Sequence, residues 1–153
     1  MKAVLKLSCA GAVLAAAVVA QSAYAAQYLE PTNAQRSYGA GVVTEGGRMV
    51  WLAGMGGTRA PDGSKVVGIT EQTRQAFRNI EAALKRAGGS LENVVSMTVM
   101  IRNQEDGDAF VKVRGEFFKS KFPASMLITA KDFANSDLLV EIQSVAVIGD
   151  QLK

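Results

Sequence analysis

One carboxylate in an apolar C-terminal stretch is the first candidate for chemistry in this sequence. Glu141 lies between Val140 and Ile142, in a segment that is otherwise mostly apolar. An apolar environment raises the pKa of a carboxyl group, which suits a general acid or base, or a group that orients water. Carboxylates on strands are also commonly exposed to solvent or paired with an arginine. Both interpretations of Glu141 stay open.

Two other positions could contact a ligand. Tyr38 begins a strand-like run rich in Gly and Val, and its hydroxyl could line a pocket or lie at the rim of a sheet. Gly54 begins a glycine-rich stretch that could let backbone N–H groups approach a ligand, or could only form turns. This stretch lacks the spacing and the lysine of a nucleotide-binding loop.

Two helices are predicted from the apolar periodicity. The first covers residues 70–87, with Thr70 as its cap and Gly88-Gly89 as its stop. The second covers residues 108–120 and buries Phe110, Val113, Phe117 and Phe118. Pro123 prevents its continuation.

Five strands are predicted around these helices, at 38–44, 48–54, 94–101, 126–130 and 138–147. The first two are expected to form a hairpin around the turn at residues 45–47, and residues 27–35 to form an extended lead-in. The order β-β-α-β-α-β-β predicts a two-layer α+β domain with both helices on one face of a mixed sheet. Because the strand at 94–101 is apolar on both faces for much of its length, we also expect an oligomer.

The first 25 residues are predicted to be a cleaved signal peptide. Lys2 and Lys6 precede a short run of small apolar residues, and Ala23-Tyr24-Ala25 fits a signal peptidase site. An uncleaved N-terminal anchor is the alternative, although the run is short for a membrane span. Cleavage leaves residues 26–153 as a single domain that is periplasmic or secreted, with no stable membrane association.

The composition of residues 26–153 excludes several classes of function. Removing Lys2 and Lys6 leaves 15 Lys and Arg against 14 Asp and Glu, a net charge of +1. This near-neutral balance gives no electrostatic basis for binding nucleic acid. The chain has no histidine, and Cys9, its only cysteine, lies within the signal peptide. A thiol nucleophile, an imidazole base and the usual zinc sites are therefore excluded, and we expect no metal and no cofactor.

Several short motifs occur in an order that resembles the RidA/YjgF family of reactive-intermediate deaminases. They are Arg36-Ser37-Tyr38, Leu52-Ala53-Gly54, the helical segment after Thr70, Phe122-Pro123-Ala124-Ser125-Met126-Leu127 and Val140-Glu141-Ile142. The resemblance covers roughly residues 36–149. It implies a chorismate-mutase-like fold and a homotrimer with small-molecule clefts between neighbouring subunits.

The resemblance also implies roles for individual residues. Glu141 would help to place the attacking water, Tyr38 would contact the ligand, and backbone groups near Gly54 and the Met126–Leu127 strand would hold it. Familiar members have an arginine where this chain has Ser125, and a serine cannot replace its charged, bidentate fork. Some branches combine Pro-Ala-Ser with an arginine in the second helix, as Arg114 stands here. That arginine could turn to the cleft or face solvent.

The sequence is compatible with two functions. The first is an imine or enamine deaminase of altered or weak activity, with Glu141 as its catalytic residue and with Tyr38, Gly54, Ser125, Leu127 and Arg114 at the ligand. The alternative is a trimer that binds or scavenges a small metabolite without turning it over. Nucleic-acid cleavage, a third activity attached to the family, is disfavoured by the near-neutral charge.

Overall fold

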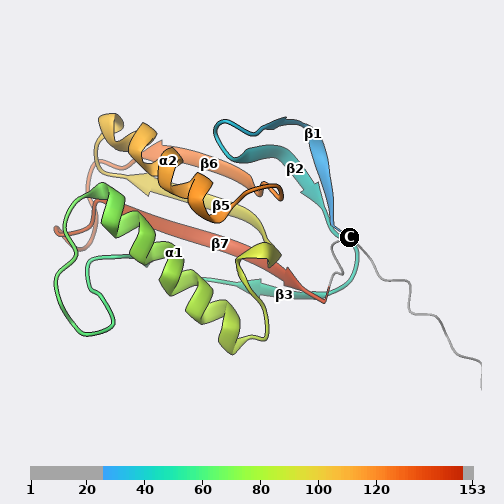
Figure 1. Cartoon of the computed structure of the whole chain (residues 1–153), viewed down its shortest axis with the longest axis horizontal. Coiled ribbons are helices and arrows are strands. Elements are labelled where there is room, and N and C mark those ends of the chain that lie inside the picture. The colour runs from blue at the N-terminus through green and yellow to red at the C-terminus, as the bar shows by residue number, and fades with distance from the viewer. Residues whose placement is uncertain (1–25, 150–153) are drawn as a thin grey trace, which may run out of the picture.

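The computed structural model describes residues 26–149, which form one mixed sheet with two α-helices packed on one of its faces (Figure 1). The two-layer α+β prediction is confirmed. The predicted signal peptide lies outside the described residues. In chain order the elements are β1 (Gln27–Asn33), β2 (Tyr38–Val43), β3 (Arg48–Trp51), β4 (Met55–Gly56), α1 (Ile69–Arg86), η1 (Leu91–Asn93), β5 (Val94–Ile101), η2 (Gln104–Asp106), α2 (Gly107–Phe117), β6 (Ala124–Thr129) and β7 (Val140–Ile148).

The strand order is β1-β2-β6-β5-β7-β3, with the short β4 also paired to β7. The β5–β6 and β2–β6 pairs are parallel and the other pairs are antiparallel. The central strand β5 covers residues 94–101, as predicted, and the two C-terminal strands begin and end within two residues of their predicted limits.

The predicted hairpin between residues 38–44 and 48–54 is wrong. Gly46 and Gly47 do form a turn with positive φ angles of 78° and 70°, but the strands on either side separate after it. One edge of β2 pairs with β1 and the other with β6, while β3 pairs with β7. A strand has only two edges, and both edges of β2 are taken by strands other than β3. The predicted lead-in at 27–35 is one of these partners.

Both helices form where they are predicted, but the N-terminal cap of α1 and the C-terminal end of α2 differ from the prediction. Helix α1 starts one residue before Thr70, and its cap residue is Gly68 rather than Thr70, with no side-chain cap. The stop is as predicted, since the N–H groups of Gly88 and Gly89 donate to the carbonyl groups of Lys85 and Leu84. Helix α2 ends at Phe117, three residues earlier than predicted.

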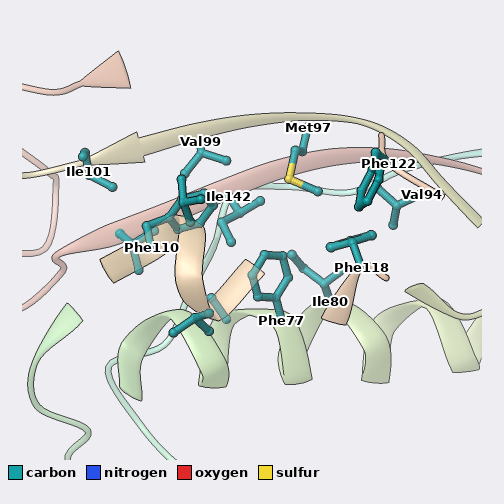
Figure 2. Packing of buried hydrophobic residues seen from close by; sticks show 14 of the residues in the cluster. Phe77, Ile80, Val94, Met97, Val99, Ile101, Phe110, Phe118, Phe122 and Ile142 are labelled. Atoms are coloured by element: carbon teal, nitrogen blue, oxygen red, sulfur yellow. The ribbon is translucent and has the colours of Figure 1, made fainter. Parts of the chain in front are cut away.

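The hydrophobic core lies between these helices and the sheet (Figure 2). Phe77 from α1 packs against three phenylalanines, and its ring centroid lies 4.9 Å from that of Phe117. From β5, the side chains of Met97, Val99 and Ile101 point to the helices and are at most 2% exposed. The core therefore fixes which alternate residues of each strand face the helix layer.

The opposite face of the sheet is not covered by any described element, and we call it the open face. Trp51 is 70% exposed there, beside Val145 of β7, and Met126 and Ile128 of β6 are also exposed. Apolar side chains on both faces of the sheet agree with the expectation of an oligomer, which stays a prediction. Among the described helices, none is long and apolar enough to span a membrane.

Candidate functional site

Glu141 lies on the open face of β7. Its neighbours Val140 and Ile142 are fully buried in the core, so strand alternation points Glu141 the other way. Its partner across the sheet is Met100 of β5, whose own partner on β6 is Ile128. Glu141 is thus partly buried in an apolar row, and it makes no hydrogen bond or ion pair with a described side chain.

Gly54 lies directly against this carboxylate. A Cβ atom added at Gly54 would be 2.4 Å from Oε1 and 2.8 Å from Cδ of Glu141. Every residue other than glycine would push the carboxylate away, because real Cβ contacts of this length do not occur. The structure therefore brings together two of the predicted site residues that are far apart in the sequence, Glu141 of β7 and Gly54 of the segment between β3 and β4.

The segment before Glu141 is fastened by the buried side chain of Gln72 in α1. Its Nε2 donates to the carbonyl groups of Val66 and Asp137, and its Oε1 accepts from the N–H of Leu139, with distances of 2.8–3.2 Å. One amide thus ties two loops to the helix and fixes the start of β7. Arg102 adds to this support, since its Nε donates to the carbonyl of Leu138 at 2.9 Å.

A second group of predicted residues meets on the other side of the sheet. Ser125 pairs with the buried Met97 and so faces the helix layer, where its Oγ accepts a hydrogen bond of 2.8 Å from Nη1 of Arg114. The guanidinium carbon of Arg114 lies 6.0 Å from the ring centroid of Tyr38. We call Tyr38, Arg114 and Ser125 the Ser125 cluster.

Arg114 is buried, at 2% exposure, and the solvent-facing alternative for this residue is wrong. Its Nη2 donates to the carbonyl of Arg36, and its guanidinium lies over the ring of Phe110 at 5.2 Å. Among the described residues, no carboxylate lies within ion-pair distance of Arg114, and its Nε has no hydrogen-bond partner. Burial, together with the charge of Arg36, lowers the pKa of Arg114 to about 10, so the group remains charged at neutral pH.

Two hollows are lined in part by predicted ligand contacts. One, of about 360 Å³, includes Tyr38 and Ser125 among its lining residues. The other, of about 390 Å³, lies between the end of β6 and the start of α2, and includes Leu127, Arg36, Glu105 and Asp108. Arg36 was not among the predicted ligand contacts, because only the fold brings it beside Leu127. A larger hollow of about 560 Å³ beside α1 and η1 contains none of the predicted site residues.

The Ser125 cluster and Glu141 cannot contact one small ligand within a single chain. Strand β5 lies between β6 and β7, which places β6 and β7 about 10 Å apart. Ser125 also points to the helix face, whereas Glu141 points to the open face. The predicted site residues thus form two separate groups. Within residues 26–149, no cluster of three or more potential metal ligands occurs.

The chain matches the family described as Endoribonuclease L-PSP over residues 29–148. It is 34% identical over 103 residues to the 2-iminobutanoate/2-iminopropanoate deaminase of Dermatophagoides farinae, which covers 67% of this chain and 80% of that protein. Its identity to the human protein of the same name is 30% over 103 residues, covering 67% of this chain and 74% of the human protein.

Solved structures show the same fold. A Rid-family protein from Yersinia pestis, YyfB, of unknown function, superposes with a TM-score of 0.72 over 80% of this chain and 98% of its own, at 23% identity. A member of the YjgF/YER057c/UK114 family from Mycobacterium tuberculosis gives a TM-score of 0.60 at 25% identity, over 81% of this chain and 100% of its own. The fold and the sequence matches define one class of small α+β proteins. The chain belongs to the RidA/YjgF family.

Proposed function

We propose that this protein hydrolyses the C=N bond of a small 2-imino acid or its enamine form, and so releases ammonia. The main support for this proposal is the position of Glu141. Its carboxylate is partly buried in an apolar row and lies against Gly54, and it has no side-chain partner among the described residues. The relatives named as 2-iminobutanoate/2-iminopropanoate deaminases support the same reaction class.

The reaction requires one water and one proton carrier. In our proposal the Glu141 carboxylate accepts a proton from water as the oxygen attacks the imine carbon. The nitrogen on the resulting tetrahedral carbon takes up this proton from Glu141 and then the proton of the new hydroxyl group. The C–N bond breaks, ammonia leaves, and the oxygen becomes the carbonyl of a keto acid. The reaction consumes one water for each ammonia released, and Glu141 returns to its starting state.

The ligand would lie between subunits of a homotrimer. Glu141 and the backbone at Gly54 form one wall in this proposal, and Tyr38, Ser125 and Leu127 of a neighbouring subunit form the other. The separation of these two groups within one chain supports this arrangement, as do the exposed apolar side chains of the open face. Arg114 would act from behind the surface, because its charge reaches a ligand only through the Ser125 hydroxyl.

The proposal includes export and a lowered or altered activity. The pattern of residues 1–25 supports a periplasmic or secreted protein, away from cytosolic sources of imino acids. Replacing a desolvated charged partner of a carboxylate costs on the order of 2–5 kcal/mol, which corresponds to roughly 10²-fold or more in binding. A neutral hydroxyl at Ser125 therefore suits a different or more weakly bound substrate than an arginine would.

Ammonia release from enzymatically generated 2-iminobutanoate tests the proposal. We expect activity in the purified protein and its loss in Glu141→Ala. Ser125→Arg should be combined with Arg114→Leu, because Nη1 of Arg114 occupies the space beside Ser125 and two guanidinium groups would repel there. Light scattering after gel filtration gives the oligomeric state. A native protein that releases no ammonia but binds the product keto acid would favour the non-catalytic binding trimer.

A further inference from the structure

The cavity beside Leu127 contains one accessible cation. The side chain of Arg36 is 46% exposed and lines this cavity of about 390 Å³, whereas Arg114 is buried and does not line it. Among the described residues that line the cavity, Arg36 is the only cation, and Glu105 and Asp108 are the anions. A ligand that enters beside Leu127 can reach the guanidinium of Arg36, whereas neither Arg114 nor Ser125 is among the residues that line this cavity.

The backbone of Arg36 is held in place on both sides. Its N–H donates to Oδ1 of Asn33 at 3.0 Å, and its carbonyl accepts from Nη2 of Arg114. The next residue, Ser37, is buried and has a positive φ of 55°, which is unfavourable for a non-glycine residue and persists only where the surroundings enforce it. The side chain of Arg36 therefore extends from a fixed point.

The present partner of Arg36 is easily exchanged. Its Nη1 lies 3.2 Å from Oδ1 of Asp108, and the Asp108 side chain is 93% exposed. An exposed pair of this kind contributes little to stability, since water and salt screen it. A ligand carboxylate can thus take the place of Asp108 without leaving a buried charge unpaired.

We propose that Arg36 binds the carboxylate of the ligand by exchanging its contact with Asp108, and that Arg114 is the positioning residue that fixes Arg36 from below. The ligand class rests on the proposed function. In this arrangement the cation missing from position 125 is supplied from the turn before β2. The ligand carboxylate thus keeps an ionic contact, to Arg36, although β6 offers only the hydroxyl of Ser125.

Binding of 2-oxobutanoate, the stable keto acid product of 2-iminobutanoate hydrolysis, tests this inference. We would titrate it into the purified native protein by calorimetry, with 2-oxobutanamide as a neutral probe of the same shape. Arg36→Gln should weaken 2-oxobutanoate binding at least 10-fold, because the cavity would keep Glu105 and Asp108 and have no cation. Asp108→Asn should strengthen it severalfold by removing the competing carboxylate, and neither change should alter binding of the amide by more than about twofold.

Two controls separate a direct contact from a structural effect. Arg36→Lys retains the charge and should recover part of the affinity, and 0.5 M salt should weaken binding of the acid but not of the amide. Circular dichroism should show native folding in the Arg36 variants, since the contacts of Arg36 to Asn33 and Arg114 involve only its backbone.

The inference is overturned if the native protein does not bind 2-oxobutanoate or if Arg36→Gln binds it as the native protein does. It is also overturned if only Arg114→Met loses binding, which would assign the anion contact to the Ser125 cluster. Its failure is distinct from that of the proposed function. Glu141-dependent ammonia release with unchanged affinity in Arg36→Gln refutes the inference alone, whereas Arg36-dependent binding without ammonia release refutes the deaminase alone.

Discussion

Gly54→Ala should displace the Glu141 carboxylate and leave the stability of the fold almost unchanged. The added Cβ would lie 2.4 Å from Oε1, and ordinary contacts begin near 3.4 Å, so the carboxylate has to move by about 1 Å. Gly54 is not among the described glycines with positive φ, so alanine fits its backbone. The nearest atoms are the far end of a flexible side chain, which can rotate away.

The expected change in stability is small because two effects oppose each other. Gly→Ala at a compatible backbone stabilises by about 0.4–1 kcal/mol through the unfolded state. Forcing Glu141 away from its preferred rotamer costs about 0.5–1.5 kcal/mol. The free energy of unfolding should therefore change by less than about 1 kcal/mol. The rate of ammonia release should fall about 10²-fold, since a misplacement of 1 Å at a reacting group has an effect of this size.

The assay is a double-mutant cycle with Glu141→Gln. Gly54→Ala should lower ammonia release in the native background and have little further effect in the Glu141→Gln background, because both changes remove the same group from the reaction. Native activity in Gly54→Ala would refute the role of Glu141 at this position. Equal losses in both backgrounds would show that Gly54 acts through something other than the carboxylate.

Four changes elsewhere test the structure around the site. Gly57→Ala should destabilise strongly in urea denaturation, because its Cβ would meet the backbone of α1, 2.1 Å from the carbonyl oxygen of Gln72. Gln72→Ala should lower the free energy of unfolding by about 2–4 kcal/mol, since it leaves buried backbone groups unpaired, and a loss below 0.5 kcal/mol would contradict this role. Tyr28→Phe should leave the melting temperature unchanged or raise it, because the buried hydroxyl has no partner among the described residues. The hydrogen bond from Arg74 lowers the pKa of Glu116, so Glu116→Gln should lose stability at pH 7 relative to the native protein. The difference should shrink as the pH falls below the ordinary carboxyl pKa of 4.5 and through the lowered pKa of Glu116; a difference independent of pH would contradict this reasoning.

The fold was predictable wherever local pattern and tertiary packing agree. Strand β5 and helix α1 have strong periodicity, and both appear within one residue of their predicted limits. The hairpin failed because the glycines at 46–47 indicate a turn but carry no information about which strands compete for β2. Strand β1 was hidden by its polar sequence, which resembles a loop until its pairing partner is known.

The candidate site residues can be named from the sequence, and their roles stay predictions, but their arrangement cannot be predicted from it. The proximity of Gly54 to Glu141 depends on the antiparallel register of β4 and β7, which no local signal contains. The burial of Arg114 similarly depends on Ser125 and on a turn 78 residues earlier in the chain. Helix periodicity alone would have placed this arginine equally well in solvent, because a buried cation opposes the usual preference for apolar residues.

In our proposal, the serine at position 125 leaves the positive charge of the site to Arg36 and does not remove it. Two guanidinium groups cannot share the space beside Ser125, since Nη1 of Arg114 already lies 2.8 Å from Oγ. An arginine on the strand and an inward-pointing arginine on α2 therefore exclude each other unless an anion lies between them. Because the Ser125 hydroxyl accepts from Arg114, its own proton is directed elsewhere and is polarised by the charge behind it. In this proposal a ligand would meet a neutral donor on the strand and an exposed cation at Arg36, a combination that favours a smaller or differently oriented anion than an arginine fork on the strand would.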